Sequence, residues 1–126
     1  MGKFLIFQNE KGLRFHLKAS NGETIATSEL YTTLASLRSG VESIRKNAPK
    51  AKLQDLTKEA KKVTNPRFQV FLDKGGYYRF NLYARNGQII ASSQPYTSWE
   101  ACCSGIESVR NNAPEAEIEY AKSAVT

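Results

Sequence analysis

Few side chains in this sequence have the types and spacing that catalysis or metal binding requires. His16 is the only histidine, and no Cys, Asp or Glu stands near it at the spacing of a metal site. Cys102 and Cys103 are adjacent, and neighbouring Cα atoms lie ~3.8 Å apart, below the ~4.4–6.8 Å of a usual disulfide. The sequence contains no activating base for a thiol, glycine-rich phosphate loop, nucleophile elbow or zinc-binding helix motif. It therefore predicts no enzyme, no metal site and no cofactor.

Basic residues are the remaining candidates, and they are unevenly distributed. The net charge is +6; residues 1–65 hold 12 Lys and Arg against 6 Asp and Glu, whereas residues 66–126 hold 6 of each. Much of the excess lies in Lys46, Lys50, Lys52, Lys58, Lys61 and Lys62. Such a cluster attracts nucleic acid or an acidic partner, but it also serves as a solvated segment that keeps a protein soluble. Both interpretations stay open at this point.

The segments expected to form the secondary structure occur twice in the sequence. Residues 14–51 align with residues 79–116 without a gap, and 20 of the 38 positions are identical. A unit of roughly 60 residues is only marginally stable by itself, so we expect the two copies to share one core. The expected organisation is a first repeat over residues 1–57, a polar linker over 58–66 and a second repeat over 67–126.

Each copy predicts three strands, a helix and a fourth strand. The Asn-Gly pair at residues 21–22 predicts a two-residue hairpin with a type I′ turn, in which both central residues have positive φ. That turn places Ala19 opposite Thr24 and Leu17 opposite Ala26. One face of the sheet then carries Phe15, Leu17, Ala19, Ala26 and Ser28, and the other carries Arg14, His16, Lys18, Glu23 and Ile25.

A helix over residues 33–47 and its equivalent in the second copy are expected to cover the first of these faces. Apolar residues recur at helical spacing in both: Leu34, Leu37, Val41 and Ile44, then Trp99, Cys102, Ile106 and Val109. Thr97 followed by Glu100 predicts a capping box in the second copy.

The helices also contain residues that indicate how they pack. Glycine costs ~1 kcal/mol relative to alanine in a helix, so Gly40 and Gly105 predict a crossing too close for a side chain, with the small residues Ala26 and Ser28 making the room. We expect Tyr31 and Tyr96 to pack over the helix starts. Two i, i+3 pairs are expected to be exposed and worth only ~0.2–0.5 kcal/mol each: Glu42 with Arg45, and Glu107 with Arg110.

Three motifs occur twice in the same order: F-x-L-x-A-x-N-G, I-A-x-S-x-x-Y-T and S-G-[VI]-E-S-[IV]-R-x-N-A-P. Together they resemble the YegP-like family of small bacterial proteins, over nearly the whole chain. The resemblance implies an α+β fold in which two β-β-β-α-β repeats form a single antiparallel-rich sheet with both helices on one face. It also implies exchange of the C-terminal strands, so that the strand near Leu53 pairs with the second repeat and the strand near Ile118 with the first. The family has no established biochemical function.

The uncovered face of the sheet is the expected binding surface. It combines Arg14, His16, Lys18 and Ile25 with Arg79, Asn81, Tyr83 and Ile90, and Lys58, Lys61 and Lys62 add basic charge in the linker. We therefore expect a non-enzymatic interaction module whose partner, a protein or a second copy, contacts this face or a sheet edge. The alternative is weak, nonspecific nucleic-acid binding by charge and stacking. Because no apolar run approaches the ~20 residues of a membrane span and no signal peptide is evident, we expect a cytoplasmic protein.

Overall fold

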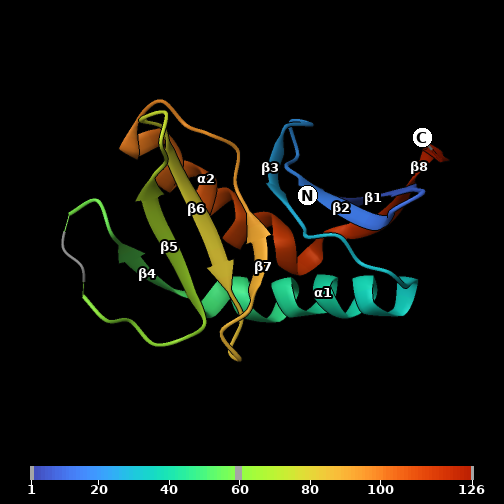
Figure 1. Ribbon diagram of the computed structural model, residues 1–126, viewed down its shortest axis with the longest axis horizontal. Coiled ribbons are helices and arrows are strands. Elements are labelled where there is room, and N and C mark those ends of the chain that lie inside the picture. Colours follow the sequence, from blue (N-terminus) through green and yellow to red (C-terminus); the bar gives the residue numbers. More distant parts are fainter. Residues whose placement is uncertain (1, 59–60, 126) are drawn as a thin grey trace.

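The computed structural model describes residues 2–58 and 61–125, with the last four of these as backbone only. The first repeat comprises β1 (Lys3–Asn9), β2 (Gly12–Lys18), β3 (Thr24–Thr27), α1 (Leu34–Asn47), the 3-10 turn η1 (Ala48–Lys50) and β4 (Lys52–Asp55). The second comprises β5 (Arg67–Leu72), β6 (Tyr78–Tyr83), β7 (Ile89–Ser92), α2 (Trp99–Asn112), the 3-10 turn η2 (Ala113–Glu115) and β8 (Glu117–Val125) (Figure 1). Among the described helices, none has the length and apolar character of a membrane span.

The described strands form one mixed sheet in the order β4-β5-β6-β7-β3-β2-β1-β8. Strand β4 of the first repeat pairs in parallel with β5 of the second, and β8 of the second pairs in parallel with β1 of the first. The implied α+β fold and the exchange of C-terminal strands are therefore confirmed. As a result, β4 and β8 lie at opposite ends of the molecule (Figure 1).

Both helices pack on the same face of the sheet and hold its two halves together. Between β3 and β7 the pairing of described residues is a single bridge, Thr27 with Ser92. Helix α1 contacts both β2 and β7, and α2 contacts both β6 and β3, so each helix spans the junction. The four phenylalanines Phe4, Phe15, Phe68 and Phe80 are fully buried beneath them, in one core to which both repeats contribute.

The hairpin turns differ from the prediction. Gly22 has a φ of +87°, but Asn21 does not share the positive φ that a type I′ turn requires. The Gly22 amide donates to the Ala19 carbonyl, and the Ala19 amide donates to the Glu23 carbonyl, each at 2.9 Å. This is a three-residue loop with a type I turn followed by a bulged glycine. Ala19 is therefore paired with Glu23 and not with Thr24, and the second copy has the same turn at Gly87.

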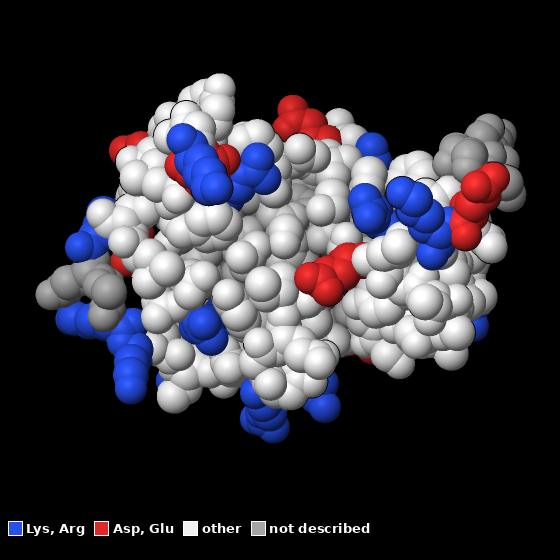
Figure 2. All heavy atoms as spheres, viewed as in Figure 1, with Lys and Arg blue, Asp and Glu red and all other residues white. Residues whose placement is uncertain are grey.

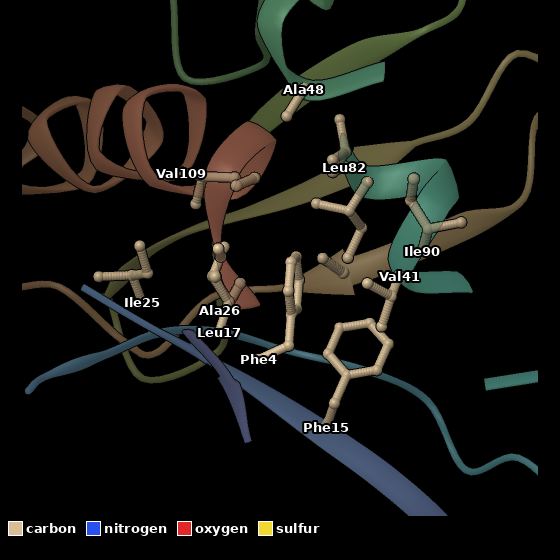
Figure 3. Packing of buried hydrophobic residues seen from close by; sticks show 14 of the residues in the cluster. Phe4, Phe15, Leu17, Ile25, Ala26, Val41, Ala48, Leu82, Ile90 and Val109 are labelled. Carbon is tan, nitrogen blue, oxygen red and sulfur yellow. The ribbon is translucent and has the colours of Figure 1, made fainter. Parts of the chain in front are cut away.

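A β-bulge after each turn restores the predicted register. Leu17 still pairs with Ala26, because Ile25 is the extra residue of the bulge. Ile25 and Ile90 consequently face the helices and are 6% and 7% exposed, so their predicted place on the open face is wrong. Figure 3 shows them on opposite sides of the core, Ile25 toward α2 and Ile90 toward α1. The helix of each repeat thus packs against the isoleucine in the β-bulge of the other repeat.

The helices begin one residue later than the capping-box prediction required. The Ser98 hydroxyl accepts the Ala101 amide of α2 at 3.0 Å, and the Thr33 hydroxyl accepts the Ser36 amide of α1 at 3.1 Å. These N-caps occupy equivalent positions in the two repeats. Thr97 is not the cap, although Glu100 does lie in the first turn of α2, where a negative charge is favourable.

The helix glycines are required by a close contact, but with a different neighbour from the one predicted. An ideal Cβ on Gly40 would lie 2.2 Å from the Tyr31 Oη and 2.8 Å from its Cζ. On Gly105 it would lie 2.3 Å and 2.7 Å from the same atoms of Tyr96. The tyrosine rings, and not the small side chains of β3, occupy the space beside the glycines.

Candidate interaction surface

The face of the sheet opposite the helices carries most of the predicted binding residues. Alternation along β1 and β2 puts three cross-strand pairs on it: Lys3 with Lys18, Leu5 with His16 and Phe7 with Arg14. The equivalent pairs of β5 and β6 are Arg67 with Tyr83, Gln69 with Asn81 and Phe71 with Arg79. We call this surface the open face. Phe7 and Phe71 were not predicted on this face. The alternation of faces along the strands FLIF and FQVF would have indicated it, because it puts the last residue of each on the side opposite to the first.

In the second repeat, the predicted groups of the open face are already engaged. The Arg79 Nε donates to the Asp73 Oδ2 at 2.6 Å, and this bond, together with the Tyr77 and Gly75 amides, lowers the pKa of the Asp73 carboxyl. The Arg67 guanidinium lies 3.9 Å from the centroid of the Tyr83 ring. The Arg79 charge is therefore compensated, and one face of the Tyr83 ring is covered.

In the first repeat, Lys3 pairs with Glu119, but the other two cations of the open face are free. The side chains of Arg14 and Lys18 form no hydrogen bond or ion pair with any residue that the structure describes. Between them the His16 ring lies 4.6 Å from the Phe7 ring. Burial, and then the charges of Lys18 and Arg14, lower the pKa of His16, so its ring is neutral at pH 7. We refer to Phe7, Arg14, His16 and Lys18 as the basic patch.

The linker lysines lie elsewhere. The Lys58 ammonium sits 3.7 Å from the centroid of the Trp99 ring, at the start of α2. Lys61 and Lys62 are exposed beside β4, where the Lys61 carbonyl accepts from the Gln54 side chain at 2.8 Å. The predicted surface is thus divided between two places. Figure 2 shows Lys and Arg in separate groups, one around the linker and another over the first repeat's strands, with mostly uncharged surface and some Asp and Glu between them.

Asp55 anchors the exchanged strand β4 to α2 of the other repeat. Its Oδ2 accepts the Trp99 indole N–H at 2.6 Å. Burial raises the pKa of this carboxyl, but hydrogen bonds from Thr57 and Trp99 and the charge of Lys58 outweigh that effect and lower the pKa overall. A depressed folded-state pKa stabilises the fold above the unfolded value of ~3.9, and that contribution is lost as the pH falls through the folded-state pKa.

We therefore expect Asp55→Asn to reduce stability at pH 5–7 and to have a shrinking effect in acid. Urea unfolding of both proteins at a series of pH values measures the difference. Glu10→Gln, an exposed change in the turn between β1 and β2, is the control and is expected to change stability much less. A constant difference between wild type and Asp55→Asn from pH 7 to pH 2 would contradict the assigned role of the Asp55 charge.

Both thiols are held in the protonated form. Burial raises the pKa of Cys102 to about 12, and burial together with the Asp55 charge raises the pKa of the half-exposed Cys103. Within the described part of the chain, no three His, Cys, Asp or Glu side chains gather in a way that could hold a metal ion.

Arg45 and Arg110 form the predicted i, i+3 pairs with Glu42 and Glu107, and they also join the two repeats. Arg110 of α2 donates to the Ala51 carbonyl at 2.8 Å, just before the exchanged strand β4, and its guanidinium lies 5.3 Å from the Phe68 ring of β5. Arg45 of α1 makes the equivalent contacts with the Ala116 carbonyl and the Phe4 ring. Their side chains are only 26–27% exposed, so the prediction of exposed pairs is wrong for the arginines.

The chain resembles known proteins along nearly its whole length. The domain of unknown function DUF1508 matches twice, over residues 9–55 and 73–119. The UPF0339 protein in the ptx operon 5′ region of Stutzerimonas stutzeri is 39% identical over 93% of this chain and 94% of its own. The UPF0339 protein YegP of Escherichia coli K12 is 40% identical over 88% of each chain. The solution structure of yegP from E. coli, titled a protein of unknown function, has a TM-score of 0.78 at 36% identity and covers 94% of this chain and 91% of that one.

One relative corresponds to a single repeat. A UPF0339 protein of Methanosarcina acetivorans is 64% identical over 41% of this chain, and this match covers 90% of the relative. The repeat unit therefore also occurs as a short separate chain.

Proposed function

This chain belongs to the DUF1508 family of YegP-like proteins, and on that premise we propose that it is a non-enzymatic module that binds an acidic protein surface through its basic patch. The observation that carries the proposal is the pair of uncompensated cations on an exposed sheet face. Arg14 and Lys18 have no acidic partner among the described residues, whereas Lys3 pairs with Glu119 at 3.3 Å and Arg79 with Asp73. Two free cations on the same sheet face, on either side of His16, favour an anionic partner.

Apolar surface in the same place supports a protein as that partner. Phe7 and Leu5 are half-buried on the open face, next to Arg14 and His16. Protein interfaces combine an aromatic or aliphatic centre with a charged rim, and arginine is enriched in them. The neutral His16 ring adds to the apolar centre of the patch.

The non-enzymatic part of the proposal is supported by the state of the nucleophiles. The raised pKa values of both cysteines leave little thiolate at neutral pH. The His16 ring packs against Phe7 and is subject to the charges of Lys18 and Arg14, and among the described residues no carboxylate hydrogen-bonds to it to orient it as a base. We also propose a cytoplasmic location, for which two adjacent free thiols are favourable.

Nucleic-acid binding is the alternative, and the combination of two cations with the Phe7 and His16 rings favours it. The engagement of Arg79 and Tyr83 counts against it, because the one tyrosine of the predicted surface and one of its cations are then taken up within the chain. The linker lysines also lie at the far end of the sheet from the basic patch. We therefore place the protein partner first.

We expect the double change Arg14→Glu and Lys18→Glu to weaken binding to poly-L-glutamate, a model acidic polypeptide, by at least about tenfold at low salt. The matched control is Lys74→Glu with Arg85→Glu, which removes the same charge from two exposed turn residues outside the patch. Fluorescence titration of a labelled polymer measures both. Equal losses in the two variants, or no binding by the wild type, would contradict the proposal.

The same titration with labelled single- and double-stranded DNA and RNA tests the alternative. Nucleic-acid binding would show an affinity that falls steeply with salt, with a slope of about −0.7 to −0.9 per phosphate contact. Charge reversal of Lys58, Lys61 and Lys62 in a third variant separates the linker from the basic patch. Nucleic-acid affinity well above that for poly-L-glutamate, lost with Arg14→Glu and Lys18→Glu, would replace the protein partner with nucleic acid.

A further inference from the structure

The two ends of the sheet are structurally equivalent but carry opposite charge. Strand β4 ends the sheet on one side and β8 on the other, and each pairs with one neighbour, β5 or β1. At equivalent positions of the repeats, Lys50 corresponds to Glu115 and Lys52 to Glu117. The duplication has therefore kept the fold of these segments and reversed their charge.

Exposed charges of one sign predominate at each end, although Lys3 pairs with Glu119 at 3.3 Å and Arg38 donates to the Tyr120 hydroxyl at 2.9 Å at the β8 end, and Asp55 belongs to β4. We define the acidic end as Glu115, Glu117 and Glu119, and the basic end as Lys50, Lys52, Lys58, Lys61 and Lys62, all of them exposed. Residues 111–121 contain no Lys or Arg at all. The ends thus present complementary potentials on opposite sides of the molecule.

Both ends also expose apolar side chains beside these charges. Leu53 and Leu56 at the basic end are 45% and 42% exposed, and Tyr120 at the acidic end is 49% exposed. Segment 61–64 flanks β4, since the Thr64 hydroxyl accepts from the Lys52 ammonium at 3.1 Å. The regular pairing of β8 with β1 runs from Glu117 to Tyr120, and β8 is the outermost strand on that side. An outermost strand offers unpaired backbone groups to another chain.

We propose that copies of this chain associate head to tail, with the acidic end of one copy against the basic end of the next. The occupant of the β8 edge is thus a second copy, because the complementary charge lies on the same molecule. Two acidic ends repel each other, which disfavours a two-fold dimer through β8. The contact is heterologous and leaves one free end of each kind, so association continues beyond the dimer. This inference is separate from the proposed function, since it uses the ends of the sheet and not the basic patch.

Sedimentation of the purified full chain over a range of concentrations at low salt tests the proposal. The wild type is expected to show a weight-average mass that rises above the monomer with concentration, and this rise is expected to disappear above about 0.3 M salt, where the Debye length falls below ~6 Å. Glu115→Lys with Glu117→Lys, and separately Lys50→Glu with Lys52→Glu, are each expected to weaken association by at least about tenfold.

Mixing the two variants gives the decisive result. Each variant alone offers only like-charged ends to its own copies. In the mixture two contacts are compatible, one between the unchanged ends and one between the two reversed ends. An equimolar mixture should therefore regain open-ended association with the two variants alternating, as should the chain with all four changes. Far-UV circular dichroism and thermal unfolding establish that each variant is folded.

A wild type that stays monomeric at low salt, or variants that associate as the wild type does, would overturn the proposal. A two-fold dimer that survives in the Lys50→Glu, Lys52→Glu variant would overturn it as well. The Arg14→Glu, Lys18→Glu variant is expected to associate normally. Its behaviour separates failure of this inference from failure of the basic-patch proposal.

Discussion

Replacement of Gly105 by alanine is expected to destabilise the protein by about 1–2 kcal/mol, although alanine is the better helix former. Helix propensity alone would favour alanine by ~1 kcal/mol. Against this, the new methyl group would lie 2.3 Å from the Tyr96 Oη, 2.7 Å from its Cζ and 3.2 Å from a ring carbon of the buried Phe80. Overpacking of this kind typically costs ~1–3 kcal/mol, and a contact with three atoms belongs in the upper part of that range.

The Tyr96 ring has little freedom to move away. Its backbone exchanges two hydrogen bonds with Tyr78, each at 2.8 Å, so the residue is fixed to β6 at the Cα. Its ring lies nearly parallel to the Phe80 ring, at 15° with the centroids 6.3 Å apart. Relief of the clash therefore requires a change in the core or loss of the stacking.

A double-mutant cycle tests this explanation by urea unfolding. In a Tyr96→Ala background the clash is gone, so Gly105→Ala should become stabilising by about 1 kcal/mol. Ser104→Ala, at the exposed neighbouring position of α2, is the control and should be slightly stabilising in both backgrounds. Gly40→Ala should cost less than Gly105→Ala, since the three atoms nearest to its new methyl group all belong to Tyr31 and the third lies 3.4 Å away. A stabilising Gly105→Ala in the wild type would contradict the account.

Replacement of Arg110 by alanine is the second change with a large expected effect, about 2–3 kcal/mol of lost stability. Hydrogen bonds to charged groups contribute ~1.5–3 kcal/mol, and the lost donor leaves the Ala51 carbonyl without this partner. The side chain also packs on the Phe68 ring and lies 3.6 Å from the Glu107 carboxylate. The Arg110 Nε is buried without a hydrogen-bond partner, which offsets a small part of the loss.

The position of Arg110 indicates which strands should lose stability in the Arg110→Ala variant. Amide hydrogen exchange in Arg110→Ala should increase on β4 and β5, at the second repeat's end of the sheet, more than on β1 and β8. Arg45→Ala should show the reverse pattern, because Arg45 contacts Ala116 and Phe4. Arg85→Ala, in an exposed turn, is the control and should change stability by less than about 0.5 kcal/mol.

Lysine at position 110 distinguishes charge from geometry. A lysine keeps the charge but lacks the planar fork that reaches a carbonyl while lying over a ring. We expect Arg110→Lys to recover less than half of the stability lost in Arg110→Ala. Full recovery by lysine would mean that only the charge near Glu107 matters, and the joining role of Arg110 would then be wrong.

The repetition and alternation of the sequence predicted the repeat unit, but not how the two units are joined. The similarity of residues 14–51 to 79–116 indicated two equal units, whereas only the resemblance to the YegP-like family implied the exchanged strands. The core face of β2 and the apolar stripes of the helices were also predicted correctly, because period-2 and period-3.6 patterns report which side is buried.

Several wrong predictions concern positions where the same residues suit two different local backbone conformations. An Asn-Gly pair suits a two-residue type I′ turn and also a three-residue loop with a bulged glycine. The protein has the three-residue loop, and the β-bulge that follows it places the side chains of Ile25 and Ile90 in the core. Ile89 then pairs with Tyr83. The choice between Thr97 and Ser98 as N-cap is of the same kind, since both are good caps.

The sequence by itself determined that this protein is a duplicated α+β unit with a shared core, since repetition and periodicity are properties of the chain that need no third dimension. Only the tertiary structure decided which charges remain free. Exchange of β4 and β8 brings Glu119 to Lys3 and carries the linker lysines to the far end of the sheet from Arg14 and Lys18. Ion pairing depends on distances of a few ångströms between residues that are far apart in the chain, and a pattern of spacing contains no such distances.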